Sequence, residues 1–173
     1  LYSTSDLLYK KVVINLYLEG KMKKILWMIV TFTLLYSAQY EDDKRLCDGG
    51  NIVACFNMGV MHINGIRGAM KYEEKAFKYF SMACNGGDID GCFNAGKYYE
   101  DGKEIKQDYL KAVNFYTKAC DGREAYACMI LGNFYRDGKG VIEIDSTKAA
   151  NYYKKVCELG YSEGCKEFEM LKK

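Results

Sequence analysis

Eight cysteines are the residues with the clearest chemical potential in this chain of 173 residues. They form four pairs whose members stand eight positions apart: Cys47 and Cys55, Cys84 and Cys92, Cys120 and Cys128, Cys157 and Cys165. Thiols in such pairs could form disulfides, hold zinc or carry redox chemistry. Structural zinc sites favour two to four residues between paired ligands, and no Cys-x-x-Cys redox motif occurs. The spacing therefore favours disulfides, which form in oxidising compartments.

The pairs recur along the chain at a nearly fixed interval. Successive pairs begin 37, 36 and 37 residues apart, a period typical of structural repeats. Each repeat holds two blocks that match their counterparts: first blocks at Ala54–Gly59, Gly91–Gly96 and Ala127–Gly132, second blocks at Lys75–Phe80, Lys111–Tyr116 and Lys148–Tyr153.

Both blocks have the periodicity of an α-helix. Apolar or small residues stand at i, i+3, i+4 and i+7 in each: Cys92, Ala95, Gly96 and Tyr99 in a first block, Ala112, Phe115, Tyr116 and Ala119 in a second. Each repeat is therefore predicted to be a pair of helices. The sequence predicts an all-α fold, a right-handed superhelical solenoid of α/α units.

Particular residues predict where these helices meet and end. A glycine within the first helix recurs in register and predicts the close approach of a neighbouring helix: Gly59, Gly96 and Gly132. A second glycine six positions later is predicted to end that helix in a left-handed conformation: Gly65, Gly102 and Gly138. Asp108 and Ser146 are predicted starts of second helices.

The repeat also selects one cysteine pairing. One cysteine ends the second helix of a unit, and its partner lies early in the first helix of the next. The turn between them folds the chain back, so each pair can bridge a helical hairpin. Among the 105 connectivities that eight cysteines allow, we expect the four local ones: Cys47–Cys55, Cys84–Cys92, Cys120–Cys128 and Cys157–Cys165.

The N-terminal region has the features of an export signal. Met22-Lys23-Lys24 precedes the uncharged run Ile25–Tyr36, which is too short for a stable membrane anchor. We predict a signal peptide over residues 22–38, cleaved after Ser37 or Ala38, and a secreted or periplasmic bacterial protein. Residues 1–21 are interpreted as upstream translation outside the native protein. The repeat domain is then 39–173, with about three and a half repeats.

Residues 41–171 resemble Sel1-like repeats, which are related to tetratricopeptide repeats. The Cys-seven-residues-Cys pattern in every unit resembles the secreted Helicobacter cysteine-rich protein family. Two positions depart from the pattern: His62 stands where later units have Tyr99 and Tyr135, and Glu169 replaces the helix glycine in the last, truncated unit. That truncation is interpreted as a terminal cap.

The resemblance implies β-lactamase activity, with binding and weak hydrolysis of penicillin and cephalosporin nuclei or another peptidoglycan-like small molecule. The residues themselves indicate no catalytic set. Serine β-lactamases carry Ser-x-x-Lys, Ser-Asp-Asn and Lys-Thr-Gly motifs, and none occurs here. A zinc enzyme needs several histidines, and His62 is the only one, so a packing role is favoured. No catalytic residue, metal or cofactor is assigned.

The alternative function is a non-catalytic scaffold that binds a peptide or protein on a concave face. By analogy with tetratricopeptide grooves, first-helix residues beside the buried stripe would line that face. The candidate groove residues are Asn57, Asn94, Lys97, Glu100, Asn133 and Arg136. The asparagines at 57 and 94 could bind a peptide or acylamino group, or equally contact neighbouring backbone. A formal charge of +2 is too small for a nucleic-acid-binding surface.

Overall fold

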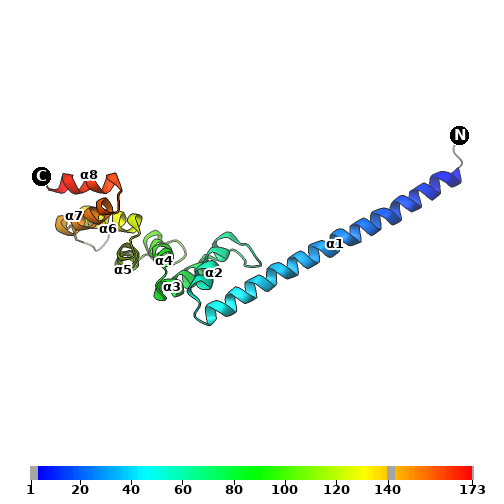
Figure 1. The fold of residues 1–173 in the computed structure, drawn as a ribbon, viewed down its shortest axis with the longest axis horizontal. Coiled ribbons are helices and arrows are strands. Elements are labelled where there is room, and N and C mark those ends of the chain that lie inside the picture. The colour runs from blue at the N-terminus through cyan, green and yellow to red at the C-terminus, as the bar shows by residue number, and fades with distance from the viewer. Residues whose placement is uncertain (1–3, 140–142, 173) are drawn as a thin grey trace.

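The computed structural model describes residues 4–139 and 143–172, which form helices and connecting loops without a strand. Eight helices occur in these residues (Figure 1): α1 (Thr4–Asp48), α2 (Ile52–Asn64), α3 (Glu73–Asn85), α4 (Ile89–Asp101), α5 (Tyr109–Asp121), α6 (Ala125–Asp137), α7 (Ser146–Glu158) and α8 (Ser162–Leu171). The predicted all-α fold is confirmed.

The helices form a solenoid of helical hairpins. We call α2, α4, α6 and α8 the A helices and α3, α5 and α7 the B helices. Helices α2, α4 and α6 each pack against the B helix that follows, and each B helix packs against the next A helix. This order confirms the helix pairs that the two sequence blocks predict.

The helix ends follow the predicted signals closely. The side chain of Asp108 accepts a hydrogen bond from the Lys111 backbone N–H and begins α5 as predicted. Helix α7 does begin at Ser146, but its N-cap is Asp145, one residue earlier. The predicted terminal glycines of the A helices all have a positive φ: 63° at Gly65, 67° at Gly102 and 69° at Gly138.

Within each unit, an aromatic ring of the B helix lies directly on the A-helix glycine. A Cβ atom at Gly96 would stand 2.8 Å from two ring atoms of Tyr116, inside van der Waals contact. Gly59 and Phe80 form the same contact in the first unit, and Gly132 and Tyr153 form it in the third. The predicted close approach is confirmed, and the group that requires it is a ring. We call this the ring-on-glycine contact.

At each end of the solenoid, a carboxylate takes the place of one partner of the ring-on-glycine contact. Helix α1 carries Asp43, which is buried, four positions before Cys47. In α3, the ring residue Phe80 stands at the same distance before Cys84. At the glycine position of α8 stands Glu169, which is exposed and pairs with Lys172. Terminal units of a solenoid present a polar outer face, and the exposed Glu169 contributes to such a face on the last unit. The capping role of the last unit stays a prediction.

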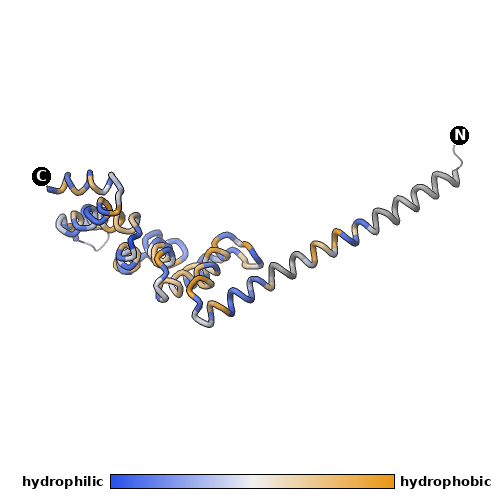
Figure 2. Tube along the Cα trace, in the orientation of Figure 1, coloured by the Kyte–Doolittle hydropathy of each residue, from blue (hydrophilic) through white to orange (hydrophobic). Residues whose placement is uncertain are grey.

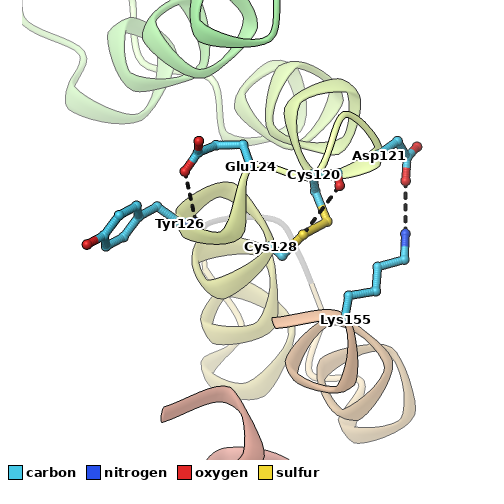
Figure 3. Close-up of a disulfide and its surroundings, with 6 residues drawn as sticks. All are labelled: Cys120, Asp121, Glu124, Tyr126, Cys128 and Lys155. Atoms are coloured by element: carbon cyan, nitrogen blue, oxygen red, sulfur yellow. Dashed lines mark hydrogen bonds and ion pairs between the residues drawn. A yellow bond between two sulfur atoms is a disulfide. The ribbon is translucent and has the colours of Figure 1, made fainter. Parts of the chain in front are cut away.

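All four predicted disulfides are present. Each joins the last turn of one helix to the beginning of the next, with Cα–Cα distances of 4.4 to 4.8 Å. Figure 3 shows the third, Cys120–Cys128, between α5 and α6. We call each turn bridged in this way a junction. The junctions covalently couple consecutive units of the solenoid.

Helix α1 has two parts with different surroundings. Its C-terminal part packs on α2, where Tyr40 contacts His62 and Cys47 is bonded to Cys55. Upstream, α1 runs away from the repeats (Figure 1), and a hydrophobic run along it is visible in Figure 2. Trp27 in this run is 71% exposed. Among the described residues, no helix is long and apolar enough to cross a membrane.

The ring-on-glycine contact predicts the effect of one methyl group. Gly96→Ala places a Cβ against the Tyr116 ring, and this overpacking outweighs the gain in helix propensity of about 1 kcal/mol. We expect a net loss of up to about 2 kcal/mol in the free energy of unfolding, measured by denaturant titration of the oxidised protein. An unchanged or raised midpoint would show that the ring can move aside.

Candidate binding face on the A helices

The six candidate groove residues lie on three successive A helices at equivalent positions. Relative to the helix glycine, Asn57 and Asn94 stand two positions before it, Lys97 and Asn133 one after, and Glu100 and Arg136 four after. We call the surface formed by these six residues the A-helix face. Their partners in the structure divide them into two groups.

Glu100 is already engaged inside its own unit. Its Oε2 accepts a 2.6 Å hydrogen bond from the hydroxyl of Tyr116, the ring that lies on Gly96. Burial raises the pKa of Tyr116, and the hydrogen bond and negative charge of Glu100 raise it further. Glu100 therefore completes the ring-on-glycine contact.

Asn133 and Arg136 are engaged in the third unit in a related way. The Tyr153 hydroxyl donates a 2.7 Å hydrogen bond to Asn133 Oδ1. Arg136 donates from Nη1 to Glu167 of α8 at 3.0 Å and from Nε and Nη2 to Asp137. Both residues therefore serve the fold, since Arg136 ties α6 to α8.

The first unit shows why these polar residues are there. Its ring is Phe80, which has no hydroxyl, and apolar Val60 and Ile63 occupy the positions of Asn133 and Arg136. In the second and third units the ring is a tyrosine, and a polar A-helix residue accepts a hydrogen bond from its hydroxyl. Sequence analysis missed this role. The sequence signal for this role is a comparison of the ring residue of each unit, Phe or Tyr, with the residues one and four positions after the A-helix glycine.

The other three candidates keep polar atoms available. Lys97 is exposed and Asn57 is half-buried, and neither side chain has a hydrogen bond or ion pair with a described residue. Asn94 donates from Nδ2 to the backbone oxygen of Asp90 at 2.8 Å. The backbone alternative therefore applies to Asn94, although the carbonyl belongs to its own helix.

A small pocket lies beside the available residues, between the first and second units. Its volume is about 150 Å³, and the lining residues are Ile63, Glu73, Asn94, Lys97, Tyr98, Asp101 and Lys103. Burial, followed by the charges of Glu73 and Glu104, raises the pKa of Tyr98 to about 12. The pocket offers ammonium, carboxylate, amide and phenol groups to a polar ligand.

The single histidine has the packing role that the sequence favours. His62 is buried, its ring is stacked on Tyr79 with a centroid distance of 5.5 Å, and it meets Tyr40 edge-on. Nδ1 lies 3.0 Å from the Met70 carbonyl oxygen, and Nε2 lies 3.3 Å from the Tyr40 hydroxyl. His62 thus joins α1, α2 and the following loop. In the described part of the chain, no three His, Cys, Asp or Glu side chains gather in a metal-binding arrangement.

Comparison with known proteins agrees with this architecture. The model of the Sel1 repeat family matches residues 52–88, 89–123 and 125–161, each segment holding one A helix and the B helix that follows it. The chain belongs to the Sel1 repeat family. No curated protein matches the chain.

Several solved structures share the fold. A Sel1 repeat protein from Oxalobacter formigenes is 26% identical, with a TM-score of 0.65, and the match covers 75% of this chain and 96% of that one. Cysteine rich protein B of Helicobacter pylori is 30% identical, with a TM-score of 0.54 and coverages of 73% and 94%. The protective antigen c5321 of uropathogenic Escherichia coli, which displays an SLR fold, is 23% identical, with a TM-score of 0.66 and coverages of 76% and 28%. The last shows likeness of fold alone.

The buried tyrosines of these Sel1 repeats predict a loss of stability in alkali. Tyr116 holds its proton more tightly in the folded state, whereas unfolded tyrosines ionise near pH 10. The contribution of protonated Tyr116 to the free energy of unfolding is complete below pH 10. It declines as pH rises above 10, by up to about 1.4 kcal/mol per pH unit. We expect the free energy of unfolding to fall between pH 10 and 12, and to fall less steeply in Tyr116→Phe.

The matched control is Tyr126→Phe, because Tyr126 is 66% exposed. Its slope should equal that of the unmodified protein in denaturant titrations across the same pH range. Equal slopes for Tyr116→Phe and the unmodified protein would contradict the role given to the Tyr116 proton.

Proposed function

We propose that this Sel1 repeat protein is an exported, non-catalytic scaffold that binds an extended acidic peptide on its A-helix face. The observation that carries the proposal is the division of the six candidates. Glu100, Asn133 and Arg136 are engaged within the fold, whereas Asn57, Asn94 and Lys97 retain polar atoms for a ligand. These three residues lie on adjacent A helices, α2 and α4.

The chemistry of these residues suits a peptide. The Asn57 amide can both donate to and accept from peptide groups. Lys97 supplies a positive charge that would pair with an acidic side chain of the ligand. Disulfides at the start of α2 and at the start of α4 hold these helices in place, which lowers the entropy cost of binding.

Export is supported by the disulfides and by α1. Four disulfides persist in an oxidising compartment such as the periplasm or the extracellular space. Residues 25–30 of the hydrophobic run that follows Lys24 are exposed on α1, which runs away from the repeats. The core of the solenoid does not include these residues. A removable signal peptide over residues 22–38 is part of the proposal, as is the exclusion of residues 1–21.

A peptide-binding experiment tests the scaffold role. Octapeptides with two fixed glutamates and otherwise random positions are screened on an array, and the strongest is measured by fluorescence polarisation at constant ionic strength. Lys97→Ala should weaken it at least tenfold because the charge pair is lost. Lys78→Ala, which removes an exposed lysine from the B helix of the first unit, should change affinity less than twofold. Equal loss in both variants would indicate non-specific charge attraction and contradict the proposal.

The β-lactam function is the rival proposal, and it rests on the family resemblance. The Lys97 ammonium beside the 150 Å³ pocket could pair with the carboxylate of a penicillin nucleus. Nitrocefin turnover by the purified, oxidised protein distinguishes the two functions. The scaffold proposal predicts turnover equal to that of buffer. Turnover that Lys97→Ala abolishes would replace it with the enzymatic function.

The export proposal predicts the N-terminus of the mature protein. Expressed with its own leader in a Gram-negative host, the chain should be recovered from the periplasm or medium, beginning at Ala38 or Gln39. Mass spectrometry of the intact protein and N-terminal sequencing measure this directly. A mature chain that begins at Leu1 or Tyr2 would contradict both the signal peptide and the interpretation of residues 1–21.

A further inference from the structure

The third junction departs from the other three at the residue that turns the chain. Three positions after the first cysteine, the other junctions carry glycines with strongly positive φ: 88° at Gly50, 101° at Gly87 and 93° at Gly160. The third carries Arg123 with φ 74°. A residue with a Cβ is disfavoured in this conformation relative to glycine. A glycine would therefore suit the backbone at this position better than Arg123 does.

A second departure lies beside it in space. Two positions after the first cysteine, the first three junctions carry glycine, whereas the fourth carries Leu159. Arg123 and Leu159 belong to different junctions, yet they line one pocket of about 310 Å³ at the ends of α5 and α7. The other lining residues are Cys120, Asp121, Lys155 and Glu158. Two exceptions to the repeat pattern therefore meet at a single cavity.

The charges of this pocket leave one cation available. Lys155 Nζ lies 2.9 Å from Asp121 Oδ1, so the two neutralise each other across α7 and α5 (Figure 3). Glu158 pairs with Lys154 at 3.5 Å. Arg123 is exposed, and its guanidinium has no hydrogen bond or ion pair with any described residue.

These groups match a particular kind of ligand. A guanidinium binds a carboxylate through two parallel N–H donors. Leu159 and Cys120 supply apolar lining, and the Asp121 and Glu158 carboxylates can accept from an N–H group. A pocket of about 310 Å³ has the size of a small-ligand site.

We propose that this pocket binds the α-carboxylate of an N-acylated amino acid with an apolar side chain, either free or at the C-terminus of a peptide. Arg123 holds the carboxylate, the acyl N–H faces Asp121 or Glu158, and the side chain contacts Leu159. The site lies at the junctions and shares no residue with the pocket beside the A-helix face. It therefore stands independently of the scaffold proposal.

The test measures binding and stability together in the full oxidised chain. The probe is N-acetyl-L-leucine, followed by isothermal titration calorimetry and NMR chemical shifts at constant ionic strength. We expect saturable binding, at least tenfold weaker binding of N-acetyl-L-leucinamide, and at least tenfold weaker binding of the probe to Arg123→Gly. The unfolding midpoint of Arg123→Gly should rise, because glycine suits the positive φ.

Arg67→Gly is the matched control. Arg67 is also an exposed arginine with positive φ, 54°, but it lies in the loop between α2 and α3. This variant should bind the probe as the unmodified protein does. Acetylated tripeptides that end in leucine, with a free or an amidated C-terminus, distinguish the sources of the carboxylate. Equal binding of the free tripeptide and the probe supports a peptide terminus, and preference for the probe supports a small metabolite.

Three results would overturn the proposal. One is the absence of saturable probe binding by the unmodified protein. Another is unchanged binding by Arg123→Gly when its unfolding midpoint is retained or raised. The third is equal binding of the acid and the amide, since the carboxylate would then not be recognised.

Discussion

The contact between a B-helix ring and an A-helix glycine sets the geometry on which the other features of this solenoid depend. A helix glycine costs about 1 kcal/mol relative to alanine, yet one recurs in every complete unit because a side chain there would collide with Phe80, Tyr116 or Tyr153. With the ring seated on the glycine, the two helices of a unit lie close together. That spacing brings the tyrosine hydroxyls within hydrogen-bond distance of Glu100 and Asn133.

The disulfides act between units rather than within them. Each disulfide constrains a junction of only a few residues. The orientation of each unit relative to the preceding one is therefore held covalently. A solenoid otherwise depends on nearest-neighbour packing, and a short array has few such interfaces. The bridges also explain how the third junction tolerates Arg123 in a conformation that favours glycine, because neighbouring constraints hold the backbone there.

Together these constraints determine which side chains remain for binding. Residues at equivalent positions of the repeat have different roles. The Lys97 side chain is available, whereas Asn133, its counterpart in the next unit, accepts a hydrogen bond from the Tyr153 hydroxyl. The A-helix face is therefore chemically uneven, with its available polar groups on the first two units. The pocket at Arg123 and Leu159 is a separate surface, formed where the ends of α5 and α7 approach each other.

The sequence by itself determined the helix pairs of the repeats, the repeat period and all four disulfides. These features are local, since a cysteine pair eight residues apart, a capping aspartate and an apolar stripe all act within one hairpin. The tertiary structure decided which polar residues form hydrogen bonds and ion pairs within the fold. Glu100 meets Tyr116 from 16 positions away and Arg136 meets Glu167 from 31, and helix periodicity carries no information about such pairs. It also placed Arg123 beside Leu159, because only the packed solenoid brings the ends of two B helices together.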